Sequence, residues 1–374
     1  MRSGRFQGRC PAICPWSPSR WTPTCASPRP PKRRSSTTLA ERAPRGGSGS
    51  TTGGRVRPRR SGSPTCPPCS GSMWTAGHAG SIWDGTVRSR LAFSRTSKRS
   101  AAMSESPDET IERLLETARQ AARAGARVLL ERFTHPRQIG TKSSPTDLVT
   151  DADRASEAEI LRCIEQRHPR ARILAEESGV HGSADRGGAG TTWVVDPLDG
   201  TVNYAWGIPH WCISIAVLEG GAPVVGVVYD PIRQECFEAI RGGGARMNGE
   251  PMATGGRSEI SDAILATGFS YDLDERRRHL PSLQRLLLRC RGLRRFGSAA
   301  LDLAWVACGR LDGFWERALK PWDLAAGLLL VAEAGGRISG YEKDEDPLRS
   351  GRVVAAGPRL HGLLRRSVAS ADPP

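Results

Sequence analysis

The sequence has no long apolar run, and acidic residues are nearly missing from its first hundred positions. No stretch approaches the roughly 18 consecutive apolar residues that a membrane-spanning helix needs, which excludes a membrane protein. Residues 1–102 hold 19 Lys and Arg but only two acids, Glu41 and Asp84, for a net charge of +17. The other 272 residues hold 35 bases and 37 acids, a net charge of −2. The overall charge of +15 therefore says nothing about most of the chain.

The basic segment 1–102 is predicted to be disordered. It carries 12 of the 27 prolines and no sustained apolar periodicity, so it cannot bury enough surface to offset its ordering entropy. Three interpretations stay open. The segment is a transit peptide, a tail that binds nucleic acid through phosphates, or upstream DNA read from a start codon placed too early. In the last case Met103 opens the natural chain.

Residues 103–374 are enough for a substantial core, as one large domain or two subdomains. Their cysteines are scattered and lie mostly within apolar runs, which is typical of thiols in a reducing compartment rather than of a disulfide framework. We therefore expect a cytoplasmic protein. The cysteines are Cys163, Cys212, Cys236, Cys290 and Cys308.

Apolar spacing predicts an α+β fold in which sheets lie between layers of helices. A capping box at 106–109 begins a helix that ends before His135-Pro136, and a loop is expected at 136–149. A second helix is expected from Thr150 to His168. Further helices are predicted at 276–290, 298–308 and 321–334, and at the C-terminus. Strands are predicted at 172–175, 192–195, 211–218, 223–229, 235–240, 263–267, 293–296 and 353–356.

Two carboxylates follow the apolar strand at 192–195. Asp196 comes at the strand end, Pro197 is expected to force a turn, and Asp199 lies three residues on. Held in one small volume, the two acids would repel, and Mg²⁺ with its preference for oxygen ligands would relieve that repulsion. Gly200 and Thr201 can open a short helix whose backbone N–H groups bind phosphate. An Asp-Gly turn capped by Asp196 explains the same spacing without any metal.

Acids at two other element boundaries favour the metal interpretation. Glu176 and Glu177 follow the strand at 172–175, and Asp323 lies in the first turn of the helix at 321–334. Each has an ordinary alternative, a solvated loop for the glutamates and compensation of the helix dipole for Asp323. Three such sites together are harder to explain as incidental. The sequence also lacks a Gly-x4-Gly-Lys phosphate loop and a His-Glu-x2-His zinc pair.

Four separated motifs resemble the inositol monophosphatase family, of bacterial type, over residues 108–370. They are Asp-Pro-Leu-Asp-Gly-Thr at 196–201, Ala-Glu-Glu-Ser at 175–178, Pro-Trp-Asp-Leu-Ala-Ala-Gly at 321–327, and the segment 142–153. The resemblance implies a layered α-β-α-β-α sandwich and Mg²⁺-dependent hydrolysis of a small phosphate monoester. It also implies a homodimer and sensitivity to lithium.

Carried over by position, the family motifs assign roles to specific residues. The first metal would be held by Glu176, Asp196 and the carbonyl of Leu198, and the second by Asp196, Asp199 and Asp323. The attacking water would be oriented by Glu176 and Thr201, with Asp153 hydrogen-bonded to Thr201. Phosphate would be bound by the amides of Gly200 and Thr201, with Lys142 nearby or beside a third metal.

The resemblance extends to a wall that binds substrate hydroxyls, formed by Ser298, Ala299 and Glu316. The alternative for Glu316 is a surface acid at a strand end. Lys320 stands where animal members have histidine, which leaves the preferred substrate open. Inositol 1-phosphate is expected, and histidinol phosphate, fructose 1,6-bisphosphate and 3′-phosphoadenosine 5′-phosphate are alternatives. An alternative from another class of function is a nucleic-acid-associated regulatory protein that acts through its basic segment.

The charge difference between the two parts generates a first prediction. If residues 1–102 bind nucleic acid, the full chain should be retained on heparin in a salt-dependent manner, because phosphate-like contacts are screened by salt. A chain of residues 103–374 should elute much earlier. Equal retention of the two chains would exclude the segment as a binding element.

Overall fold

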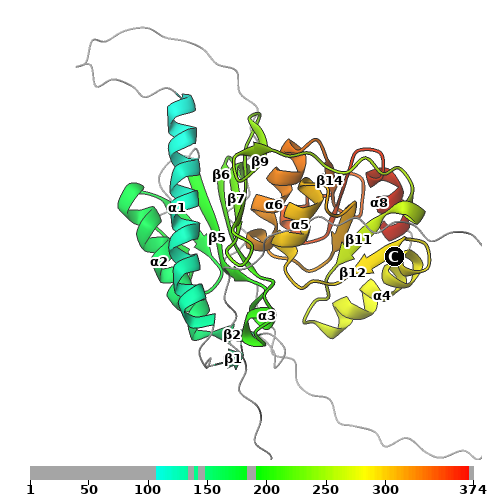
Figure 1. Ribbon diagram of the computed structural model, residues 1–374, viewed down its shortest axis with the longest axis horizontal. Coiled ribbons are helices and arrows are strands. Elements are labelled where there is room, and N and C mark those ends of the chain that lie inside the picture. Colours follow the sequence, from blue (N-terminus) through cyan, green and yellow to red (C-terminus); the bar gives the residue numbers. More distant parts are fainter. Residues whose placement is uncertain (1–106, 134–138, 142–147, 183–190, 370–374) are drawn as a thin grey trace, which may run out of the picture. The chain divides into compact units, whose positions relative to one another are not determined.

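The computed structural model describes residues 107–133, 139–141, 148–182 and 191–369. The segment 1–102, which the sequence predicts to be disordered, lies outside these described residues. Helices and strands alternate irregularly along the described chain (Figure 1). The helices are α1 (Pro107–Phe133), α2 (Asp151–Arg167), α3 (Thr201–Ala205), α4 (Leu273–Leu287), α5 (Ala299–Ala307), α6 (Pro321–Glu333), α7 (Pro347–Ser350) and α8 (His361–Ala369), with a 3₁₀ turn at Ile260–Asp262.

The larger sheet has eight strands in the order β10-β9-β8-β7-β6-β5-β3-β4. Its strands are β3 (Arg172–Ala175), β4 (Gly179–His181), β5 (Thr191–Asp199), β6 (Cys212–Glu219), β7 (Ala222–Asp230), β8 (Glu235–Ile240), β9 (Gly244–Met247) and β10 (Glu250–Pro251). Strand β3 runs parallel to β5, whereas the other pairs are antiparallel. The carboxyl ends of β3 and β5 therefore meet at the same edge.

The smaller sheet has five strands in the order β12-β11-β13-β15-β14. They are β11 (Ile264–Thr267), β12 (Gly292–Arg294), β13 (Gly313–Glu316), β14 (Arg337–Ser339) and β15 (Val353–Ala356). Strand β11 is parallel to both β12 and β13, so three neighbouring strands end at one edge.

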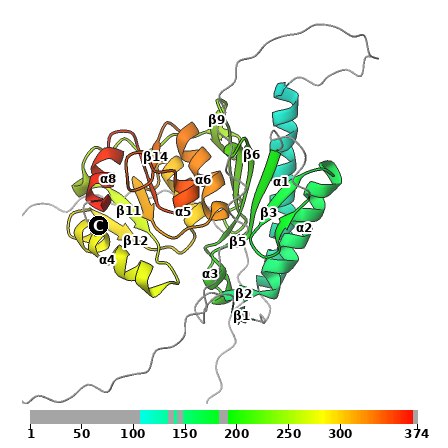
Figure 2. The same cartoon turned by 180° about the vertical axis from the view of Figure 1, so that it is seen from behind.

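The helices separate the two sheets and cover their outer faces, which makes five layers (Figures 1 and 2). Helices α1 and α2 pack on one face of the larger sheet, α5 and α6 fill the space between the sheets, and α4 and α8 cover the smaller sheet. The predicted α-β-α-β-α sandwich is confirmed. Strand β6 is buried along nearly its whole length because helices lie on both of its faces.

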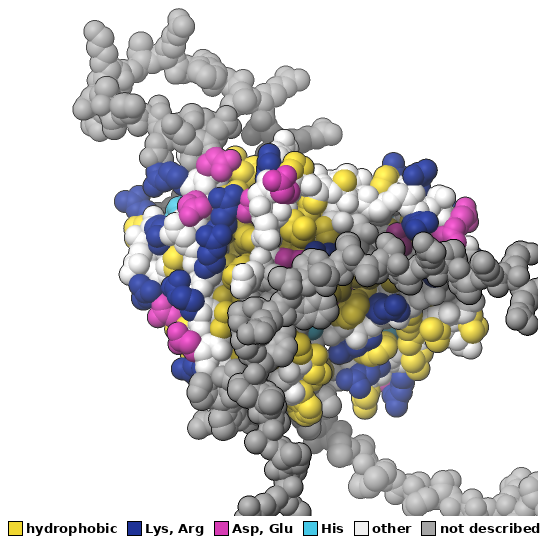
Figure 3. Space-filling view, viewed as in Figure 1, with side chains coloured by type: hydrophobic (Ala, Val, Ile, Leu, Met, Phe, Trp, Pro, Cys, Tyr) yellow, Lys and Arg dark blue, Asp and Glu magenta, His cyan; other side chains and the backbone are white. Residues whose placement is uncertain are grey.

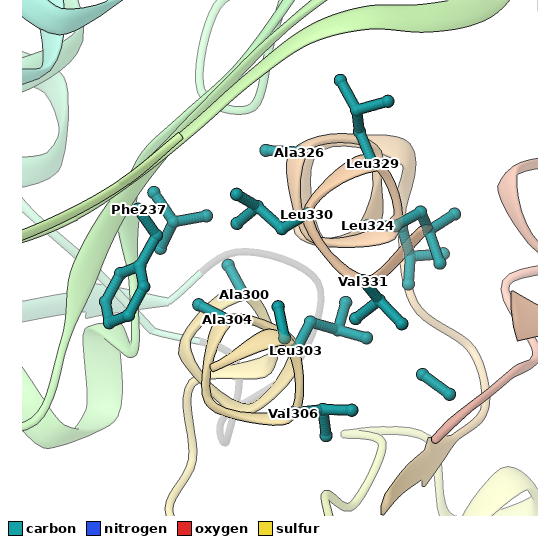
Figure 4. Close-up of a cluster of buried hydrophobic side chains, with 14 of the residues drawn as sticks. Phe237, Ala300, Leu303, Ala304, Val306, Leu324, Ala326, Leu329, Leu330 and Val331 are labelled. Carbon is teal, nitrogen blue, oxygen red and sulfur yellow. The ribbon is translucent and has the colours of Figure 1, made fainter. Parts of the chain in front are cut away.

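The central layer is held by small and branched side chains. Leu303 of α5 packs against α6 at Gly327, Ala304 of α5 lies on the side of the larger sheet, and Leu330 of α6 points toward Phe237 of β8 (Figure 4). A second cluster joins α1 and α2 to the larger sheet, and a third joins α4 and α8 to the smaller sheet. Each sheet is therefore fixed on both faces.

Several boundaries differ from those that the sequence predicts. The expected loop at 136–149 contains two short paired strands, β1 (Ile139–Thr141) and β2 (Leu148–Thr150), which are too short to give a periodic signal. The helix predicted at 276–290 begins at Leu273, because the Asp272 side chain caps it by accepting from Asp274 N at 2.8 Å and Glu275 N at 2.9 Å. Strands β4, β13 and β14 and helix α7 were not predicted.

The expected turn at Pro197 is also wrong. Strand β5 continues through Pro197 to Asp199, and the pairing with β6 shifts register between Asp196 and Asp199. A bulge of this kind bends a strand and re-aims its side chains without ending it. Asp196 and Asp199 therefore both belong to the carboxyl end of β5.

One face of the described chain combines basic and apolar side chains over α4 (Figure 3). Leu273, Leu280 and Leu287 recur at seven-residue spacing and are 63%, 55% and 56% exposed. Across the described residues, no helix combines the length and apolar character that crossing a bilayer requires.

The contact between β7 and α6 generates a second prediction. A Cβ at Gly226 would lie 3.0 Å from Ala326 O and 3.1 Å from Ala326 Cα, which are backbone atoms of α6 that cannot move alone. Gly226→Ala should therefore lower the free energy of unfolding by about 1–3 kcal/mol. Gly256→Ala is the control, since its Cβ would meet only the flexible end of Arg359 at 3.1 Å. Urea unfolding measures both, and equal stability of the two variants would contradict the prediction.

Candidate active site

A cavity of about 270 Å³ lies where the carboxyl edges of the two sheets approach each other. The larger sheet supplies Glu176 after β3 and Asp196 and Asp199 from β5, and the first turn of α6 supplies Asp323. The smaller sheet supplies Glu316 at the end of β13. The structure thus brings together acids that lie up to 147 positions apart in the sequence.

Strand pairing places Glu176 beside Asp196. Ala175 and Val195 are partners in the parallel pair of β3 and β5, so the next residue of each strand falls at the same level. Glu176 N donates to Val195 O at 3.1 Å, which holds the end of β3 against β5. The two acids therefore leave neighbouring strand ends toward one volume.

Each aspartate of the cluster is anchored by a hydrogen bond that the chain donates. Asp196 Oδ1 accepts from Leu198 N at 2.9 Å across the bulge. Asp199 Oδ2 accepts from Ser298 Oγ at 2.6 Å and from Ala300 N at 2.7 Å, which ties β5 to the N-terminus of α5. These anchors fix the carboxylates before any ligand arrives.

Asp323 is the third residue of α6, and its Oδ2 accepts from Lys320 N at 2.7 Å. This is one half of a capping box, so the acid fits the helix dipole as expected. Ser214 Oγ donates to Trp322 O at 3.0 Å and fastens the same turn to β6. Dipole compensation and membership of the acid cluster are therefore compatible for Asp323.

Burial and mutual repulsion shape the titration of the cluster. Burial raises the pKa of Asp196 well above its ordinary value, and the charges of Glu176, Asp199 and Asp323 raise it further. Burial raises the pKa of Asp199 to about 6, although the hydrogen bonds from Ser298 and Ala300 oppose the shift. The pKa of Asp323 is raised in the same direction, first by burial and then by Asp199 and Glu176. No positively charged side chain of the described residues is among the main causes that shift the pKa of these three carboxylates.

The donor set suits a hard divalent cation. Carboxylate oxygens of Glu176, Asp196, Asp199 and Asp323, together with the carbonyl of Leu198, give only oxygen ligands, which Mg²⁺ prefers. In the described part of the chain, no three His, Cys, Asp or Glu side chains have the spacing of a formed metal site. The fit to a cation therefore rests on the chemistry of the donors and on their repulsion.

Thr201 connects the acid cluster to α2. Its Oγ1 lies 3.1 Å from Asp153 Oδ1 and 3.1 Å from Leu198 O, so one hydroxyl proton has two acceptors. Asp153 is fully buried at the start of α2. Gly200 has a φ of 100°, and a Cβ there would lie 3.1 Å from His210 O, so the turn into α3 requires glycine.

The opposite wall of the cavity belongs to the smaller sheet. Glu316 is 8% exposed, so the interpretation of it as a surface acid is wrong. Burial raises its pKa to about 8, against the opposing charge of Arg295. Ser298 and Ala299 also line the cavity, but the Ser298 hydroxyl already donates to Asp199. Lys142 lies outside the described residues.

The cavity contains residues that sequence reasoning missed. Gly268, Arg295 and Asp302 line it, and Asp302 is 1% exposed with no hydrogen-bond partner for its Oδ1 among the described residues. Ala318 lies on the same wall with a φ of 64°, a left-handed conformation that costs a non-glycine residue energy. Parallel strand ends were the available signal for Gly268 and Arg295, because each directly follows a strand.

A layered sandwich with an acid-lined cavity between its sheets is typical of a class of phosphatases. The four sequence motifs predicted the same class. The chain belongs to the inositol monophosphatase family, whose family model matches residues 110–372. It is therefore a phosphatase of a generally metal-dependent family that acts on small phosphate monoesters.

Individual relatives agree with this assignment. A Synechocystis protein named inositol-1-monophosphatase is 43% identical over 260 residues, covering 68% of this chain and 88% of the relative. An Escherichia coli protein named Nus factor SuhB is 40% identical over 249 residues, covering 66% of this chain and 92% of the relative.

Solved structures show the same fold. Inositol monophosphatase from Anabaena (Nostoc) has a TM-score of 0.63 and 40% identity, covering 71% of this chain and 98% of that one. The extragenic suppressor protein suhB from Bartonella henselae has a TM-score of 0.65 and 37% identity, with 68% and 98% coverage.

The raised pKa values generate a third prediction. Without metal, protons on the folded carboxylates stabilise the fold at low pH, and this stability is lost as pH rises from about 4 through the raised pKa values, near 6 for Asp199. Asp196→Asn removes one charge and keeps an acceptor for Leu198 N. In EDTA at pH 8 the variant should therefore melt above wild type, and the difference should shrink at pH 5.

A rise of a few degrees is expected, since about 1 kcal/mol corresponds to roughly 2–4 °C in a domain of this size. Asp274→Asn is the control because that side chain is 73% exposed. A lower melting temperature for Asp196→Asn than for wild type at pH 8 would contradict the electrostatic account.

Proposed function

We propose that this phosphatase hydrolyses inositol 1-phosphate to inositol and phosphate with Mg²⁺ as its cofactor. The supporting observation is one cavity that holds a repelling cluster of aspartates on one side and a buried acid, Glu316, on the other. The first side suits cations and phosphate, and the second suits a hydroxyl group. The relative named inositol-1-monophosphatase supports the same substrate.

Glu176, Asp196 and the carbonyl of Leu198 would hold a first Mg²⁺ ion. Asp196, Asp199 and Asp323 would hold a second. Bound Mg²⁺ supplies a water of lowered pKa and neutralises charge on the leaving oxygen. Such chemistry needs no cysteine or histidine nucleophile.

The chain's own groups position the reactants. Glu176 and Thr201 orient the attacking water, and Asp153, an acceptor 3.1 Å from the Thr201 hydroxyl, holds that hydroxyl in place. The amides of Gly200 and Thr201 would bind the phosphate, and Lys142 would act near it or beside a third metal. Ser298 positions Asp199 through its 2.6 Å hydrogen bond and, with Ala299, shapes the hydroxyl wall.

Other phosphate monoesters remain alternatives within the same chemistry. Histidinol phosphate, fructose 1,6-bisphosphate and 3′-phosphoadenosine 5′-phosphate would all use the aspartate cluster. The two bisphosphates would bring a second phosphate toward the far wall, which carries Glu316, Asp302 and Arg295. A panel of substrates distinguishes these compounds from inositol 1-phosphate.

A second candidate function is regulatory. Several relatives carry the name Nus factor SuhB, and residues 1–102 carry a net charge of +17. A role in binding nucleic acid through this segment is a separate proposal from the enzymatic one, and the intact acid cluster makes the two compatible.

We also propose a homodimer, a cytoplasmic location and sensitivity to lithium, as the family resemblance implies. The exposed leucines of α4 support a subunit contact, because apolar side chains at such spacing are rarely left in water. The five cysteines of the described chain are free thiols, which supports a reducing compartment.

Phosphate release with and without Mg²⁺ tests the enzymatic proposal. Inositol 1-phosphate should be the preferred substrate in a panel with the three alternatives, and EDTA should abolish release. Asp196→Asn should lower kcat on the order of 10³-fold, comparable to the loss of one preorganised electrostatic group. Circular dichroism controls for folding. Full activity of this variant would overturn the metal assignment, whereas preference for another substrate would overturn only the choice of inositol 1-phosphate.

A further inference from the structure

Three parallel strands of the smaller sheet end on the cavity wall opposite the aspartate cluster. Gly268 follows β11, Arg295 follows β12, and Glu316 ends β13. The strand order is β12-β11-β13, so Gly268 comes from the strand between those that carry the two charged side chains. Ligands of open sheets bind outside such carboxyl ends.

Gly268 makes room for the carboxylate of Glu316. Thr267 and Trp315 are partners in the parallel pair, so Gly268 and Glu316 are the next residues at the same level. A Cβ at position 268 would lie 2.2 Å from Oε2, 2.3 Å from Oε1 and 2.4 Å from Cδ of Glu316. Any side chain there would push the carboxylate out of its seat.

Arg295 lines the same cavity from the end of β12, but its side chain is exposed. A Cβ at Gly297 would lie 2.6 Å from Arg295 Nη1, and the guanidinium group lies 5.8 Å from the ring centroid of Phe269. The wall therefore presents a buried carboxyl group that is held in place and a solvent-exposed guanidinium group that can donate.

We propose that Gly268 and Arg295 are specificity-determining residues: Gly268 seats the Glu316 carboxylate as an acceptor, Arg295 lines the same wall as a donor, and together they select phosphate esters of polyols with at least two hydroxyl groups. A hydroxyl that donates to Glu316 and a second that accepts from Arg295 satisfy both groups. This inference rests on the proposed phosphatase function and adds the residues that choose the alcohol.

The test compares two substrates on the full chain with Mg²⁺. Inositol 1-phosphate carries hydroxyls on its leaving group, and p-nitrophenyl phosphate carries none. Gly268→Ala should lower the ratio of their kcat/KM values about tenfold, mainly through the KM of inositol 1-phosphate, as expected for one lost hydrogen bond. The fold should survive, because the atoms that must move are the end of one side chain.

A conservative second substitution distinguishes displacement of the Glu316 carboxylate from a general loss of activity. Glu316→Asp shortens the side chain by one methylene, so in the Gly268→Ala background it should restore part of the lost ratio. Gly292→Ala is the matched control, since that glycine opens β12 in the same sheet and its Cβ would meet only Arg294 Nη1 at 3.2 Å. Equal loss of activity on both substrates in Gly268→Ala, or no rescue, would overturn the seating role.

Arg295→Gln should lower the same ratio about tenfold for the same reason. Arg294→Gln is its control because Arg294 is the neighbouring exposed arginine, which donates to Leu293 O and is not among the residues that line the cavity. An unchanged ratio in Arg295→Gln would overturn the donor role. If wild type prefers inositol 1-phosphate but neither Gly268→Ala nor Arg295→Gln changes the ratio, the inference fails and the proposed function stands. If wild type shows no such preference, both fail.

Discussion

Electrostatic repulsion among buried carboxylates is the constraint on which the site depends. Burial raises the pKa of Asp196, Asp199 and Asp323, and the charges of neighbouring carboxylates of the cluster, Glu176 among them, raise each further. A fold does not gain stability from such an arrangement. It persists because hydrogen bonds from Leu198, Ser298 and Lys320 fix the carboxylates, and because the layers around them are densely packed. The cost in stability is the condition for attracting cations.

The same anchors join parts of the molecule that would otherwise be independent. Asp199 belongs to the larger sheet, yet it accepts from Ser298 and Ala300 at the start of α5, a helix of the central layer. Trp322 at the start of α6 accepts from Ser214 of β6. The cavity is therefore assembled by contacts between layers, and its geometry depends on the packing of α5 and α6 against both sheets.

The sequence predicted the larger sheet side of the site better than the smaller sheet side. Long apolar runs mark β5, β6 and β7, and motifs mark Asp196, Asp199 and Asp323, so their positions could be read locally. The bulge that keeps β5 intact through Pro197 could not, because register depends on the partner strand. Gly268 and Glu316 lie 48 positions apart and meet only through the pairing of β11 and β13. Lys142 and residues 1–102 stay predictions, since they fall outside the described chain.

The two sheets contribute to the cavity in different ways, and this has an evolutionary consequence. In the proposed function, the residues that would face cations and phosphate come from β3, β5 and the first turn of α6, whereas those that would face the alcohol come from the ends of β11, β12 and β13. Substitutions in the smaller sheet can therefore accumulate without disturbing the hydrolytic centre. A lineage can exchange one alcohol for another through paired changes at neighbouring strand ends, where a larger side chain at one position requires a smaller one at the next. Members of a single family with the same metal ligands can in this way diverge in the compounds they consume.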